Sequence, residues 1–394
     1  MKKKIEEIIV TLLVIALFIM TFIVTIKQFT VSSCDYSVHL SEALNQGVFP
    51  NSLESAVEYL WHACVMVVYR IIPAITPEYA ATIVSSAVNS FTYIIVFCYM
   101  IKNNNCRLLA AVFTFCLFFI GPLYLPWFNE NYYLGQSLSN TWHNPTNLMV
   151  KPFAVLTFIL IVDILRGYKD HIINYKKLVI LAVINFISCF AKPSWNQIFL
   201  PSMLIYLLIV MIQSRTIETL KFCFIIGAAL LPAGLIMLLQ FFTTFGQSAD
   251  GGEPARIIIA PFVVVRNYTS SPLISFIISF TFPIIVFLCN KRIAKDTDTK
   301  FALILWVIGS AERSLLAESG ARMYHGNLGW GAALATLLIH LVAFNKFEEY
   351  VENSDMDSRA DRWKLRIQLG FLLIGVWFGL RYWYRLATIE GLWL

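Results

Sequence analysis

The sequence predicts an all-α polytopic membrane protein. Of its 394 residues, 58% are hydrophobic and 14% are charged, whereas a soluble globular protein carries roughly 25% charged residues. Residues 8–26 form a run of nineteen positions without a charge, long enough to cross a hydrocarbon core at about 1.5 Å per residue. Phe, Tyr and Trp make up 15% of the chain, which suits lipid-facing surfaces and interfacial belts.

The apolar runs predict about eleven transmembrane helices. They lie at 8–26, 79–101, 108–125, 148–165, 178–191, 198–213, 222–245, 272–289, 301–317, 328–345 and 366–384. The first run exceeds the core of a secretory leader, so we expect a retained anchor whose flanking lysines keep the N-terminus in the cytoplasm. Residues 52–75 are interrupted by ionisable side chains, including Glu58 and His62, which favours an interfacial helix lying along the membrane surface.

The distribution of positive charge supports one topology. Most of the 30 lysine and arginine residues fall in loops that this topology assigns to the cytoplasm, as the positive-inside rule requires. The net charge of +6 therefore needs no nucleic-acid partner. We expect a single transmembrane domain over 1–394, in the plasma or inner membrane, with external loops at 31–77, 126–147, 246–271 and 317–328.

The first external loop carries a candidate catalytic stripe in the stretch CDYSVHLSEAL. If this stretch is helical, Asp35, His39 and Glu42 fall on one face. A carboxylate and an imidazole at this spacing can act as base and orienter, or share a metal. The alternative is a solvated helix face with an N-cap, because Asp is a good capping residue.

Two further clusters place cations at the same face of the membrane. In TWHNPTNLMVKPF, His143 and Asn144 precede a span in which Lys151 lies one turn inside the outer end. This lysine either reaches the lipid headgroups or binds an anion. Lys192 precedes Pro193 where two apolar runs meet, and a cation at such a helix break can bind an anionic ligand.

The later external loops add further binding candidates. Arg256 follows a Gly- and Pro-rich stretch that could move as a lid. Arg322 and His325 follow a span interrupted by Glu312 and Arg313, and charges within a span are seldom idle. The ordinary alternatives are an exposed arginine and an ion pair at a helix end.

Several classes of site are excluded by the absence of their motifs. The chain has no HExxH or CxxC site, no GxSxG elbow and no dinucleotide fingerprint. Its eight cysteines are scattered, mostly within apolar runs, as buried free thiols are.

The order of these elements resembles the GT-C superfamily of integral-membrane glycosyltransferases. The shared features are an N-in first helix, an external loop that opens with an Asp and a downstream His, an interfacial helix and about ten further spans. The resemblance implies a sugar donor on a polyprenyl phosphate or diphosphate carrier. It implies Asp35 as the catalytic base and His39 as a second polar residue of that loop. The loop lacks a DxD or DE pair, which does not favour metal use, so no cofactor is firmly implied and a divalent metal stays an alternative.

We therefore expect an inverting glycosyltransferase that acts at the extracytoplasmic face, in cell-envelope polysaccharide or glycolipid biosynthesis. Its partners would be the lipid-linked donor, membrane lipids and a carbohydrate or glycolipid acceptor. The binding residues would come from Glu42, His143, Asn144, Lys151, Lys192, Arg256, Arg322 and His325. The alternatives are a polymerase or ligase of lipid-linked oligosaccharides, a polysaccharide-lipid transporter or flippase, and an acyltransferase using His143 or His325.

Overall fold

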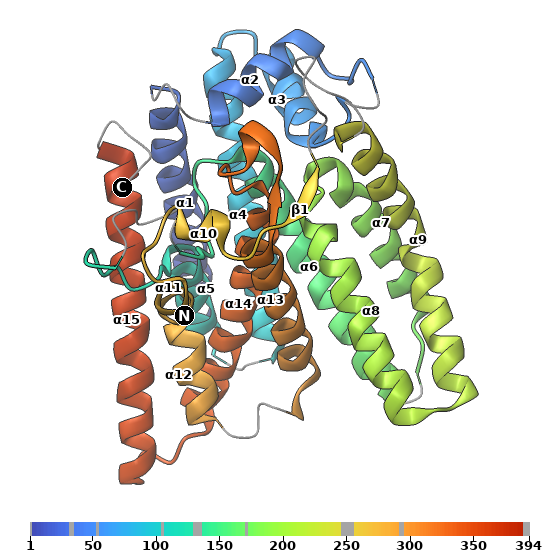
Figure 1. The fold of residues 1–394 in the computed structure, drawn as a ribbon. Coiled ribbons are helices and arrows are strands. Elements are labelled where there is room, and N and C mark those ends of the chain that lie inside the picture. Colours follow the sequence, from blue (N-terminus) through green and yellow to red (C-terminus); the bar gives the residue numbers. More distant parts are fainter. Residues whose placement is uncertain are drawn as a thin grey trace.

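The protein is a bundle of long helices in the computed structural model (Figure 1). The structure describes residues 2–30, 35–52, 55–103, 106–128, 136–169, 172–245, 256–290 and 295–388. The helices of the bundle are α1 (Lys2–Gln28), α4 (Pro77–Asn103), α5 (Arg107–Phe119), α6 (Pro145–Lys169), α7 (Tyr175–Ala191), α8 (Ser194–Ser214), α9 (Ile217–Phe245), α11 (Pro272–Ser279), α12 (Thr281–Cys289), α13 (Thr297–Leu315), α14 (Trp330–Asn353) and α15 (Arg359–Thr388).

The helices define an all-α polytopic membrane protein. Among the described residues, seven helices are long and apolar enough to cross a membrane, or eight if the bent pair α11–α12 is one span. A helix or this pair occupies each of the eleven predicted segments. Because α5, α7 and α13 do not meet the length and apolarity of a span, the number eleven stays a prediction.

The break between α11 and α12 has a local cause. The two helices are bent by 60°, and Pro283 is the third residue of α12. Its ring removes one backbone donor and clashes with the carbonyl four residues earlier, which belongs to Ser279, the last residue of α11.

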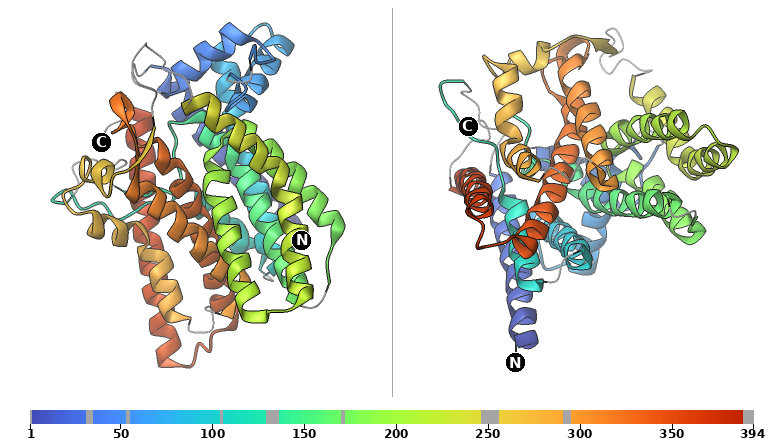
Figure 2. Two further views of the ribbon diagram at one scale, coloured as in Figure 1. Left: turned by 45° about the vertical axis from the view of Figure 1, so that its right-hand side comes forward. Right: turned by 90° about the horizontal axis from the view of Figure 1, so that it is seen from below.

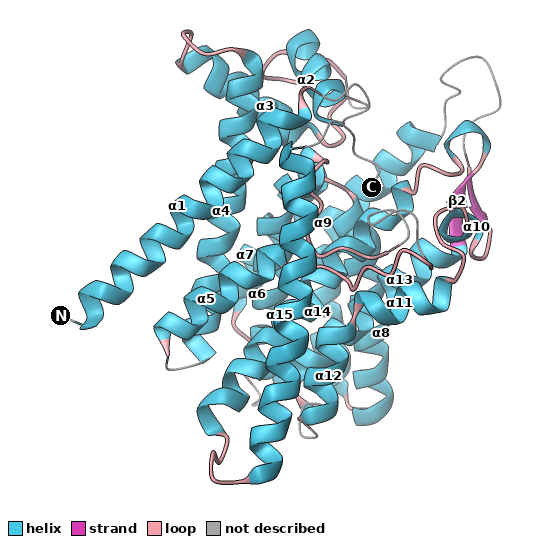
Figure 3. Cartoon of the chain, turned by 90° about the vertical axis from the view of Figure 1, so that its left-hand side faces the viewer, coloured by secondary structure: helices cyan, strands magenta, loops and turns pink. Residues whose placement is uncertain are grey.

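Two amphipathic helices lie across one end of the bundle. They are α2 (Asp35–Gln46) and α3 (Tyr59–Ile71), both at the top of Figure 1. The interfacial helix predicted over 52–75 is thus shorter than expected and covers only Tyr59–Ile71. The connections α8–α9 and α14–α15 lie at the other end, whereas α1 ends beside α2 (Figures 1 and 3).

The core is built around α14. This helix packs against α13, α8, α12 and α5, and seen along the bundle it lies between α15 on one side and α7 to α9 on the other (Figure 2). The close approach of α13 and α14 needs small residues, because a Cβ added at Gly309 would lie 3.0 Å from the Ala332 Cα.

A small antiparallel sheet joins two of the predicted external loops. Strand β1 (Ile257–Ile259) pairs with β2 (Leu316–Glu318), with Ile257 opposite Glu318. Short helical turns flank the strands: α10 (Val263–Arg266), η2 (Gly320–Arg322) and η3 (Asn327–Gly329). The sequence offers no period-2 alternation here, so this pairing is missing from the sequence prediction.

Candidate functional site

A cavity of about 1010 Å³ lies at the end of the bundle that carries α2 and α3. Its walls come from α2, the turn before α3, residues 136–144, the starts of α8 and α14, the end of α9, and the β1–α10 and α13–β2 segments. Residues from all four predicted external loops therefore line one cavity.

Seven of the ten predicted site residues line this cavity: Asp35, His39, His143, Asn144, Lys192, Arg322 and His325. The cavity wall does not include the other three, which are Glu42, Lys151 and Arg256. The same wall adds charged residues outside the predicted set: Glu58, Glu312, Arg313 and Glu318.

Asp35 is the first residue of α2, the helix that the sequence predicts here. Its Oδ2 accepts a hydrogen bond of 2.8 Å from the Asn144 Nδ2. The Asn144 Oδ1 accepts a second bond of 2.7 Å from the Asn147 backbone N–H at the start of α6. The carboxylate of Asp35 is therefore held by a side chain that α6 itself orients.

Glu58 links the turn before α3 to two other helices. Its Oε2 lies 3.0 Å from the Lys192 Nζ and 2.8 Å from the Thr146 hydroxyl of α6. Its φ of 63° is left-handed, which costs a non-glycine residue on the order of 1–3 kcal/mol. The contacts of the Glu58 carboxylate with Lys192 and Thr146 offset this cost of the strained backbone.

Lys192 occupies the break between α7 and α8 that Pro193 predicts. Its side chain is 5% exposed, and its Nζ donates to Glu58 and, at 2.9 Å, to the Thr146 Oγ1. The ammonium also lies 5.3 Å from the centre of the Trp330 ring, a cation–π distance. Lys192 is thus a paired cation at the cavity wall.

The environment shifts two pKa values in this region. Burial raises the pKa of the Glu58 carboxyl, but the charges of Lys192 and His39 and the hydrogen bonds from Lys192 and Thr146 together outweigh burial, so the pKa lies below its usual value. Burial lowers the pKa of His143 to about 4, although the Asp35 carboxylate acts in the opposite direction and the Lys192 ammonium adds to the lowering. Glu58 is therefore ionised and His143 neutral at neutral pH.

The end of α13 and the turn after β2 form a second charged wall. Arg313 donates from Nη1 to the Ser137 hydroxyl at 2.9 Å, and the exposed Arg322 lies in η2. Glu318 lies in β2 and accepts a bond of 2.7 Å from the Asn327 Nδ2. Because β2 replaces a helical turn here, the spacing of Glu318 and Arg322 does not describe a helix-end pair.

The three remaining predicted residues lie in other surroundings. Lys151 is buried, and its Nζ donates 3.0 Å to the Asn140 Oδ1 beside the Trp142 ring. Arg256 is exposed, and its backbone pairs with Ser319. Glu42 contacts the imidazoles of His39 and His62.

No protein-family model matches the chain, and a comparison with curated proteins also finds no match. The chemistry of the site therefore has to be argued from its own residues. They offer a carboxylate oriented by an amide, an acidic group paired with an ammonium, and guanidinium groups around one cavity of about 1010 Å³.

Proposed function

We propose that this protein is a membrane glycosyltransferase that uses a lipid-linked sugar phosphate as donor. The observation that carries the proposal is the position of Asp35 on the wall of a cavity of about 1010 Å³ that Arg313 and Arg322 also line. A carboxylate can accept a proton there, and guanidinium groups are suited to bind a phosphate.

The reaction follows from these roles. An acceptor hydroxyl near Asp35 attacks the anomeric carbon, and its proton passes to the carboxylate. The new bond joins the acceptor oxygen to the anomeric carbon, while the bond from that carbon to the carrier phosphate breaks. The electron pair leaves with the phosphate, whose charge Arg313 and Arg322 stabilise. Direct displacement inverts the sugar configuration.

The apolar part of the cavity fits a lipid carrier. Met237, Phe241 and Phe245 of α9 and Val264 and Val265 of α10 line it. Ligand pockets commonly have volumes of roughly 300–1,000 Å³, so this cavity has room for a sugar phosphate and the first isoprene units. A free nucleotide sugar would leave this apolar wall without a partner.

Membership of the GT-C class belongs to the same proposal. It is supported by the order of a long apolar α1, Asp35 at the start of α2, the short α3 and further long helices. An N-terminus in the cytoplasm would place the cavity at the extracytoplasmic face, which suits work on cell-envelope polysaccharide or glycolipid.

The test is an assay of the full chain in lipid with polyprenyl-phosphate sugars, followed by mass spectrometry. A glycosyltransferase consumes the donor and releases the free carrier phosphate. One added sugar indicates a single transfer, whereas a ladder of products indicates a polymerase or ligase. Saturable binding of a panel of such donors, with all of them left intact, would contradict the proposal.

That last outcome would favour a transporter or flippase. Two features support this second candidate: the bent pair α11–α12 and the break at Lys192 and Pro193. Transporters place their binding sites at such discontinuous helices. A vesicle assay that follows movement of a fluorescent polyprenyl-phosphate sugar between leaflets distinguishes the two.

A further inference from the structure

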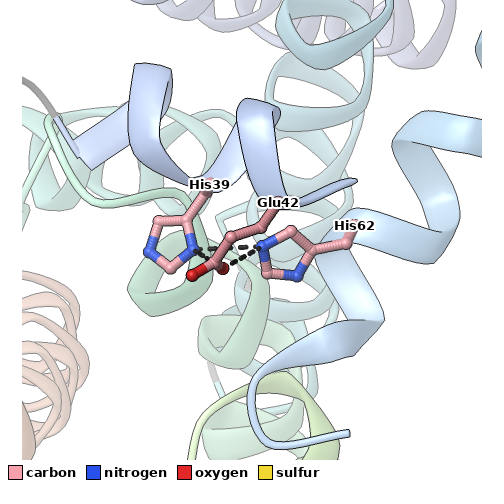
Figure 4. A group of neighbouring side chains, drawn as sticks. All are labelled: His39, Glu42 and His62. Carbon is pink, nitrogen blue, oxygen red and sulfur yellow. Dashed lines mark hydrogen bonds and ion pairs between the residues drawn. The ribbon is translucent and has the colours of Figure 1, made fainter. Parts of the chain in front are cut away.

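Three side chains outside the proposed reaction converge between α2 and α3. They are His39 and Glu42 from α2 and His62 from α3, drawn in Figure 4. The His39 Nδ1 lies 3.1 Å from the His62 Nε2. The Glu42 Oε2 lies 3.3 Å from this Nε2 and 3.6 Å from the His39 Nδ1.

The tautomer of His62 is fixed by its other nitrogen. The His62 Nδ1 lies 3.1 Å from the Glu58 backbone carbonyl. A carbonyl oxygen only accepts, so Nδ1 carries the proton and the Nε2 of the neutral ring presents a lone pair to His39 and Glu42. A metal-binding histidine is typically held in this way, with its second nitrogen donating to a carbonyl or carboxylate.

The size of the triangle matches a tetrahedral metal site. Zinc binds imidazole nitrogen and carboxylate oxygen at about 2.0–2.2 Å, which separates neighbouring ligand atoms in a tetrahedron by about 3.3 Å. The three observed separations, from 3.1 to 3.6 Å, bracket this value. Two imidazoles and one carboxylate are also the ligands of several zinc enzymes, which keep a fourth position for water or substrate.

The burial of the three residues suits exchange of a metal ion with solvent. The His62 side chain is 2% exposed and that of His39 16%, whereas the Glu42 side chain is 52% exposed. The imidazoles are therefore held by packing, while the carboxylate side is open.

We propose that His39, Glu42 and His62 bind a divalent first-row transition metal ion, with zinc as the best fit. The ion fastens α2, which begins at Asp35, to α3, whose preceding residue is Glu58. By holding the two helices together, the ion positions the cavity wall. The metal site does not depend on the proposed glycosyl transfer.

The test is metal binding by the full chain, purified with a histidine-free tag and treated with a chelator. Titration with Zn²⁺ alone, followed by elemental analysis and thermal unfolding, should give one ion per chain and a higher unfolding temperature. Glu42→Gln removes the half-exposed ligand and keeps its shape. It should weaken Zn²⁺ binding by more than about 100-fold, since loss of an outer-shell partner alone costs 10–100-fold.

His62→Gln should have the same effect, and His325→Gln, which changes a histidine outside the cluster, should bind zinc like the wild type. The proposal is overturned if the wild type binds no zinc above its chelator-treated background, or if Glu42→Gln binds it as tightly as the wild type. The cluster would then be a set of side-chain contacts that ties the two helices together.

Discussion

The Glu58 carboxylate lies 3.0 Å from the Lys192 ammonium, although 134 positions separate the two residues in the chain. This contact joins the turn before α3 to the break between α7 and α8. Because Glu58 also accepts from Thr146 at the start of α6, one carboxylate ties three parts of the cavity wall together.

Replacing one partner of this pair should destabilise the protein more than replacing both. Lys192→Met leaves the Glu58 charge without its counterion and should lower the free energy of unfolding by about 3 kcal/mol. In the double variant that also carries Glu58→Gln, much of this loss should be recovered. Thermal unfolding of the wild type, the two single variants and the double variant in detergent measures this double-mutant cycle. Lys102→Met is the control, because Lys102 is 60% exposed in its pair with Asp163 and should cost under about 1 kcal/mol. Additive effects of the two cavity substitutions would show that the pair is not coupled.

His143 should make the stability depend on pH. Its folded pKa of about 4 lies below the ordinary 6.5, so between these values the unfolded chain binds a proton that the folded chain does not. The contribution of His143 is full above pH 6.5 and is lost as the pH falls toward 4, on the order of 3 kcal/mol in total. Unfolding temperatures measured at intervals between pH 7 and 5 should fall less in His143→Gln than in the wild type or in His325→Gln. Equal slopes would contradict the assignment.

Gly379 should tolerate no side chain. A Cβ at this position of α15 would lie 1.5 Å from the Phe119 carbonyl oxygen, and backbone must move to relieve such a clash. Gly379→Ala should lower the stability by about 1–3 kcal/mol or more. Gly370→Ala is the matched control on the same helix, because nothing lies within 4 Å of its added Cβ and alanine is a better helix former. A loss of similar size at both positions would show that α15 does not pack in this way.

Arg322 should contribute to donor binding. It lines the cavity, whereas Arg256 does not, and both side chains are exposed. Loss of a hydrogen bond to a charged group costs about 1.5–3 kcal/mol, so Arg322→Gln should weaken the binding of a polyprenyl-phosphate sugar by roughly 10- to 100-fold. Arg256→Gln should bind it like the wild type. An equal loss in both variants, measured by titration in lipid nanodiscs, would indicate a general effect of positive charge.

The helices were predictable because apolar runs are a local property of the chain. The placement of Asp35, His39 and Glu42 on one face of a helix was predictable for the same reason, because it depends only on their spacing in the sequence. The position of Asn144 beside Asp35 was not predictable, because it depends on how α6 packs against the end that carries α2.

The importance of Glu58 and His62 was hidden for the same reason. Both interrupt an apolar stretch and read as ordinary polar residues of an interfacial helix, since their partners lie on other helices. Lys151 shows the opposite case: its place near a helix end suggests a ligand contact, but packing turns it toward Asn140. The spacing of Glu58 and His62, four positions apart in an apolar stretch, is the local signal that could have drawn attention to them.

The most direct test of the proposed function is the donor turnover of Asp35→Asn. The substitution keeps the size of the side chain and removes the base, so turnover should fall by about 10²–10⁴-fold while the donor still binds. Asp357→Asn, in the exposed turn before α15, should turn over the donor like the wild type. Full activity of Asp35→Asn would contradict the assignment of Asp35 as the base, and with it the account of the cavity as a glycosyl-transfer site.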